Sequence, residues 1–135
     1  MSAPPPFATK PLPDAPDVLA PDGSEVRVLL RLAGGSMAHF RLAPGEVSIA
    51  VEHRTVEELW YVVGGRGEMW RSQAGREEMT PLVPGVSLSI PLGTRFQFRC
   101  VGDVPFEAVG VTMPPWPGHD EAAHVPGRWV AKLRE

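Results

Sequence analysis

The chain has 135 residues, of which 43% are hydrophobic and 21% charged, and its formal net charge is −3. This length is typical of a single domain, and the mild acidity argues against a nucleic-acid partner, because a phosphate backbone needs clustered Lys and Arg. No apolar run approaches the roughly 18 residues of a membrane span, and residues 1–6 lack the basic start and apolar stretch of a secretory signal.

Glycine and proline are both frequent, with 14 and 16 copies respectively. Because both residues interrupt helices, they predict a turn-rich β protein rather than a helical bundle. The single cysteine, Cys100, excludes an internal disulfide and a Cys-rich metal cluster. It also favours a reducing compartment, so we expect a cytoplasmic protein.

The first part of the chain is rich in proline, with seven of the 16 prolines within residues 1–21. Proline fixes φ and removes a backbone donor, so this stretch fits neither a helix nor a central strand. We therefore expect residues 1–23 to form an irregular N-terminal arm. Two states remain open for it: disorder, or packing on a neighbouring subunit.

Short segments with alternating or β-branched residues then follow one another, with a turn signal every 8–12 residues. The expected strands are 25–32, 37–42, 47–51, 58–63, 68–71, 78–83, 86–90, 96–101 and 106–112. Gly64–Gly67 is expected to join two of them, 58–63 and 68–71, in a hairpin. This spacing predicts an all-β sandwich or barrel over residues 24–112.

A second irregular segment, 113–135, contains Pro114, Pro115, Pro117, Trp116 and Trp129. Within it, 120–123 and 128–134 are the candidates for short helices. The predicted organisation is thus one β-barrel between two irregular arms.

The glycines and prolines of the barrel resemble the two motifs of the cupin superfamily. Glu58 is followed by six residues and Gly65, as in the first motif. In the second, Gly85 is followed by five residues and then Pro91-Leu92-Gly93. The resemblance implies a single-domain cupin, that is, a double-stranded β-helix or jelly-roll barrel. The proline-rich tail is also similar to that of small bacterial single-domain cupins.

The resemblance further implies where metal ligands would lie. In metal-binding cupins, two histidines and a glutamate of the first motif and a histidine of the second hold the ion. Here these positions are occupied by Val51, His53, Glu58 and Phe96, and Cys100 stands where the second motif has an asparagine. Only His53 and Glu58 can be ligands, which is fewer than the three protein ligands that iron and zinc enzymes usually have. We expect no cofactor, with a divalent transition metal as the alternative.

Strand alternation predicts which other side chains point into the barrel. If Glu58 points inward, so does Trp60, and Phe96, Phe98 and Cys100 share one face. The expected interior is therefore apolar and aromatic, with one carboxyl and one imidazole group, and the expected wall is Val51, Trp60, Met69, Phe96, Phe98 and Cys100. A filled core and a ligand pocket both fit this composition.

Three functions remain open. In the first, the barrel binds a small hydrophobic or aromatic molecule, with metal-independent acid–base catalysis by Glu58 and His53 as a possible activity. The second is a metal-dependent cupin enzyme of the dioxygenase or isomerase type, and the third is a non-catalytic structural or regulatory dimer. The sequence leaves open whether the protein is an enzyme.

The resemblance implies a homodimer, for which Leu29, Leu30, Leu59 and Tyr61 offer apolar surface.

Overall fold

Short β-strands build almost the whole of the protein in a computed structural model, which describes residues 3–133. The strands are β1 (Val18–Leu19), β2 (Glu25–Leu32), β3 (Gly35–Leu42), β4 (Val51–His53), β5 (Glu57–Gly64), β6 (Gly67–Gln73), β7 (Arg76–Leu82), β8 (Ser87–Ile90), β9 (Arg95–Cys100), β10 (Phe106–Met113) and β11 (Ala122–His124). The expected all-β jelly roll is confirmed.

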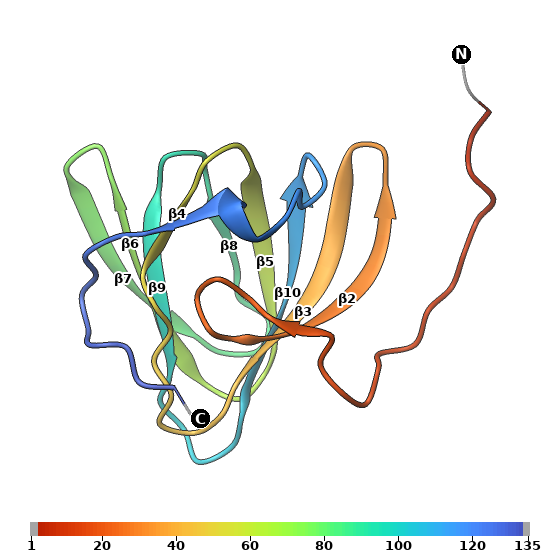
Figure 1. Ribbon diagram of the computed structural model, residues 1–135. Helices are drawn as coiled ribbons and strands as arrows, with labels where there is room; N and C mark the ends of the chain where they lie inside the picture. The colour runs from red at the N-terminus through yellow and green to blue at the C-terminus, as the bar shows by residue number, and fades with distance from the viewer. Residues whose placement is uncertain (1–2, 134–135) are drawn as a thin grey trace.

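Two antiparallel sheets face each other across the core (Figure 1). The first, sheet A, has the order β1-β2-β3-β10-β5-β8, and the second, sheet B, has the order β11-β4-β9-β6-β7. Alternation along β5 produces the two faces of sheet A, since Glu58, Trp60 and Val62 are buried while Leu59 and Tyr61 are exposed. Most of the buried core residues form one cluster between the sheets, with Met69, Phe98 and Phe106 fully buried.

The hairpin expected at Gly64–Gly67 is wrong, because β5 and β6 lie in different sheets. Gly65 makes the crossing with φ +68°, and a Cβ on it would lie 2.2 Å from the carbonyl oxygen of Pro105. The turn residues were therefore identified correctly, but they form a corner between sheets. Consecutive strands form hairpins elsewhere, at β2–β3 and at β6–β7; the second turns at Ala74 and Gly75, both at positive φ.

The N-terminal arm is fully exposed at Phe7 and contacts the chain's own barrel from Lys10 onward, before it enters the sheet. Residues 3–16 form no helix or strand and are almost entirely exposed, whereas β1 pairs with the start of β2. Arg27, on the outer face of sheet A, donates hydrogen bonds to the backbone carbonyls of Pro13 and Asp14. The arm expected over residues 1–23 therefore contains one short strand, β1.

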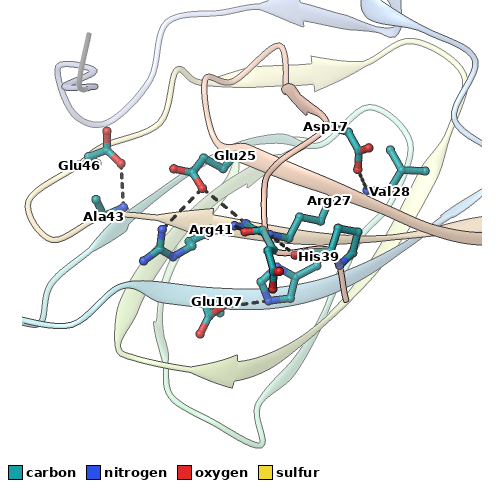
Figure 2. A network of polar contacts seen from close by, with 11 residues as sticks. Asp17, Glu25, Arg27, Val28, His39, Arg41, Ala43, Glu46 and Glu107 are labelled. Carbon is teal, nitrogen blue, oxygen red and sulfur yellow. Dashed lines mark hydrogen bonds and ion pairs between the residues drawn. The ribbon is translucent and has the colours of Figure 1, made fainter. Parts of the chain in front are cut away.

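A polar cluster surrounds this attachment point on the outer face of sheet A (Figure 2). Glu25 lies 3.5 Å from the Arg27 guanidinium and 3.6 Å from that of Arg41. His39 Nε2 lies 3.2 Å from the Glu107 carboxylate, and burial lowers the pKa of His39 even though Glu107 opposes the shift. His39 is thus a structural residue on the opposite side of the sheet from the core.

The C-terminal tail is docked on the barrel, and its described part, up to residue 133, forms no α-helix. A 3-10 turn (η1, His119–Glu121) precedes β11, which pairs with β4. Further on, the buried Gln97 side chain accepts from the backbone N–H groups of Arg128 and Trp129 and donates to the carbonyl of Trp129. Of the two candidate helices, 120–123 is present only as the 3-10 turn that ends at Glu121, and 128–134 is wrong over the described residues, because Gln97 of sheet B holds the backbone there. Residue 134 lies outside the described residues.

The described residues contain no helix that is both long and apolar enough to cross a membrane.

Candidate functional site

A cavity of about 200 Å³ opens on the inner face of sheet A. The inward side chains of β2, β3, β5 and β10 form its floor. The segment 18–22 covers one side, and Trp116, His119 and Ala122 of the C-terminal tail cover another. Both irregular arms therefore help to enclose this space.

Glu58 lies in the wall of the cavity and is only 4% exposed. Its position depends on Gly110 of β10, where a Cβ would lie 2.8 Å from Glu58 Oε2 and 2.5 Å from Phe40 Cε2. Burial raises the pKa of Glu58 to about 8. The nearby Asp22 carboxyl adds to this rise, and the Trp60 indole N–H opposes it. At pH 7 Glu58 is therefore mainly a neutral carboxylic acid.

His53, at the end of β4, lies beside Glu58 in the cavity wall, with 3.7 Å between His53 Nδ1 and Glu58 Oε1. Its ring packs edge-on against Phe96 and Trp116, with centroids 5.2 and 5.4 Å away. Burial lowers the pKa of His53 to about 4, although Glu121 acts in the opposite direction. At neutral pH the pair is thus an uncharged imidazole beside an uncharged acid rather than an ion pair.

The polar atoms of this pair are incompletely satisfied. His53 Nδ1 is shielded from solvent and has no hydrogen-bond partner among the described residues. The 3.7 Å separation from Glu58 is too long for a hydrogen bond. Buried polar groups are nearly always bonded, so unpaired ones next to a cavity are typical of a site that receives a ligand's polar group.

The expected pocket residues divide into two groups. Val51 and Phe96 line the cavity together with His53 and Glu58. Trp60, Met69, Phe98 and Cys100 are buried in the core cluster but do not line the cavity. Both a filled core and an open cavity are therefore present, at different depths of the same barrel.

The cavity also has polar wall residues that the sequence reasoning did not select, namely Asp22, Arg31, Ser36 and Thr112. Asp22 is buried and its Oδ1 accepts hydrogen bonds from the Ser24 backbone N–H and hydroxyl; burial nevertheless raises the pKa of its carboxyl. Alternation along 106–112 was a usable signal for Thr112, which follows Ala108 and Gly110 on the buried face.

Glu121 fastens the part of the tail that covers the cavity. Its carboxylate accepts from the Thr55 hydroxyl, from the Thr55 backbone N–H at 2.6 Å and from the Val56 N–H at 3.0 Å. Burial acts to raise the pKa of Glu121, but these hydrogen bonds lower it overall. His119, one of the two tail histidines, lines the cavity, whereas His124 Nε2 lies 3.0 Å from the carbonyl of Pro21.

The residues present do not fit a bound metal ion. Val51 and Phe96 are directly opposite each other on β4 and β9, and neither side chain carries a lone pair for coordination. No group of three or more His, Cys, Asp or Glu side chains within the described residues is arranged to hold an ion. One imidazole and one carboxyl fall below the usual ligand number for zinc or iron.

Comparisons with known proteins agree with this architecture. The solved structure of BH2720 from Bacillus halodurans is 20% identical, with a TM-score of 0.63 over 76% of each chain. An uncharacterised protein with a double-stranded β-helix domain from Klebsiella pneumoniae is 19% identical, with a TM-score of 0.63 over 77% of this chain and 85% of that one. Oxalate decarboxylase from Bacillus subtilis is 14% identical, with a TM-score of 0.67, and the match covers 79% of this chain and 29% of that one.

These identities are low enough that the structural likeness concerns the fold alone. No curated protein matches the sequence at a significant level. The family model described as "Cupin domain" matches residues 38–112, which is more than half of the chain. The two motif frames, the pair of facing sheets and this match together lead to one conclusion: the chain belongs to the cupin family.

Proposed function

We propose that the protein binds a small hydrophobic or aromatic organic molecule in the cavity on the inner face of sheet A. The proposal rests on the unpartnered Nδ1 of His53, 3.7 Å from the Glu58 carboxyl, beside a largely apolar space. A dry engineered cavity of about 150 Å³ can hold benzene, so about 200 Å³ is room for a ring with a small substituent. Apolar walls with a few placed polar groups are typical of ligand sites.

We further propose that Glu58 and His53 can act on such a ligand as an acid–base pair. Glu58, which holds its proton at neutral pH, would donate that proton to one atom of the ligand. His53, whose ring is neutral, would accept a proton from a neighbouring atom of the ligand. The proton taken up by His53 then passes back to the Glu58 carboxylate, 3.7 Å away, which restores both residues. The net change is an isomerisation in which no atom is gained or lost.

A metal-dependent reaction of the dioxygenase or isomerase type is not part of this proposal. The reason is the donor set, since Val51 and Phe96 occupy two of the four positions that hold the ion in metal-binding cupins. The fold likeness to oxalate decarboxylase does not change this, because the two chains are only 14% identical.

We also propose that the protein is a cytoplasmic homodimer that pairs through the outer face of sheet A. Leu59 lies opposite Val111 and Tyr61 opposite Val109, which forms two apolar rows on the exposed side of the sheet. Leu59 and Tyr61 are each about half exposed. The neighbouring charges balance, with Glu25 and Glu107 against Arg27 and Arg41, so a second copy of the same face meets no net repulsion.

The proposed cytoplasmic location is supported by the free, buried thiol of Cys100.

The binding proposal can be tested with p-cresol, a ring with one hydroxyl group, in an NMR titration of the labelled protein. We expect saturable shift changes centred on His53, Glu58 and Thr112. Ala38, which lines the cavity and points into it, is the site for a blocking variant: Ala38→Leu should abolish the changes by filling the space. Scattered changes in the wild type, or changes that persist unaltered in Ala38→Leu, would contradict the proposal.

A further inference from the structure

A row of polar side chains crosses the inner face of sheet A from one end of the cavity to the other. Glu58 is paired with Thr112, Thr112 with Ser36, and Ser36 with Arg31. All four residues line the cavity. Neighbouring strands lie about 4.8 Å apart, so the backbones of Glu58 and Arg31 are separated by roughly 14 Å.

The middle of this row is internally bonded, whereas its Arg31 end is not. The hydroxyl oxygens of Ser36 and Thr112 are 2.7 Å apart, and the Ser36 hydroxyl accepts from the Trp116 backbone N–H at 2.9 Å. Arg31 makes no hydrogen bond or ion pair with any of the residues that the structure describes. Arg31 is exposed to solvent, so its guanidinium is an unpaired charge at the solvent-facing end of a mainly apolar cavity.

A β-bulge is the reason that Arg31 faces the cavity at all. Val28 is paired with Ala38, so regular pairing would place Leu30 opposite Ser36. The register shifts by one residue between Val28 and Arg31, and Arg31 takes that inward position instead. Leu30 is left exposed on the other side. Bulges commonly re-aim a side chain next to a functional site.

We propose that the ligand of this cavity is a small monocarboxylic acid with an apolar, ring-sized body. Its carboxylate pairs with Arg31, its body lies among the apolar walls, and its far end reaches Glu58 and His53. This inference rests on the proposed function and specifies its ligand class.

Charge and size favour a carboxylate over other groups. The planar guanidinium matches a carboxylate in a bidentate geometry. One free guanidinium balances a single negative charge, whereas a phosphate monoester dianion requires further donors. An ammonium group would be repelled by Arg31 and would find Glu58 mainly protonated at neutral pH.

Calorimetric titration at low ionic strength with three isosteric probes tests the inference: 3-phenylpropionate, 3-phenylpropanamide and 3-phenylpropylamine. We expect the acid to bind about tenfold more tightly than the amide, the size of one charge-assisted hydrogen-bonded pair. Arg31→Gln should remove that difference, and added salt should weaken only the acid. Arg128→Gln is the matched control, because it makes the same change in charge at an exposed side chain outside the cavity.

The outcomes separate the two levels of the proposal. Equal binding of acid and amide that Arg31→Gln leaves unchanged, but Ala38→Leu abolishes, would overturn the carboxylate and leave the cavity proposal standing. Tightest binding of the amine would likewise overturn the carboxylate. Binding of none of the three probes at millimolar concentration would overturn both.

Discussion

The protonation of Glu58 leads to a specific dependence of stability on pH. The pKa of Glu58 is about 8 in the folded protein, against an ordinary value of 4.5. Between these values the folded state keeps a proton that the unfolded state has released. Stability from this group is therefore complete below pH 4.5 and is lost as the pH rises through 8.

His53 acts in the opposite direction, which defines the window in which Glu58 can be observed. The pKa of His53 is about 4 in the folded state, against 6.5, so stability rises with pH over that interval. The two effects oppose each other up to pH 6.5. From pH 6.5 to 8 only Glu58 of the pair is titrating, and at about 1.4 kcal/mol per pKa unit the expected loss is about 2 kcal/mol.

The perturbation is Glu58→Gln, which keeps the shape of the protonated acid but cannot ionise. Urea unfolding followed by tryptophan fluorescence at intervals from pH 6 to 8.5 gives the free energy of unfolding for both proteins. The wild type should lose about 2 kcal/mol more than the variant between pH 6.5 and 8. Glu57→Gln, at the exposed neighbouring position on β5, should behave like the wild type.

Parallel curves for the wild type and Glu58→Gln would contradict the raised pKa, because they would mean that Glu58 ionises in the folded state as it does in the unfolded state. A direct check is the ¹³C shift of the Glu58 carboxyl carbon, which should titrate near pH 8. A midpoint near 4.5 would contradict the acid–base proposal, because Glu58 would then have lost its proton at neutral pH.

Three further predictions concern the surroundings of the site. Gly110→Ala should cost about 1–3 kcal/mol of unfolding free energy, because the added methyl group overlaps Phe40 and the Glu58 carboxyl. Gly34→Ala is the control, since a Cβ there meets nothing within 4 Å. Equal effects of the two substitutions would contradict this account of the packing. Glu121→Gln should raise the rate of limited proteolysis in the tail, because the amide cannot accept from all three donors that it meets; an unchanged cleavage rate argues against the fastening. Tyr61→Glu should convert the proposed homodimer to a monomer in light scattering. Leu92→Glu is the control and should leave the dimer intact, because Leu92 is equally exposed but lies outside the proposed interface. A monomeric wild type would contradict the dimer proposal.

Much of the fold could be predicted from the sequence because it depends on local patterns. Glycine and proline spacing located the turns, and alternation correctly assigned Glu58 and Trp60 to the buried face of β5. The two motif frames also identified Val51 and Phe96 as neighbours of His53 and Glu58 in the cavity wall. The hairpin at Gly64–Gly67 failed because a turn signal does not say which sheet the next strand will join.

Local sequence patterns do not show how distant segments meet. They predict a turn-rich barrel with one inward acid and one inward imidazole. The row from Glu58 to Arg31 depends on strand pairing between residues up to 76 positions apart, such as Ser36 and Thr112, and on a one-residue bulge without a sequence signal of its own. Likewise, burial beneath both arms sets the protonation of Glu58 and His53. Charge states and cavity walls follow from the packing of non-neighbouring residues, and local periodicity does not encode that packing.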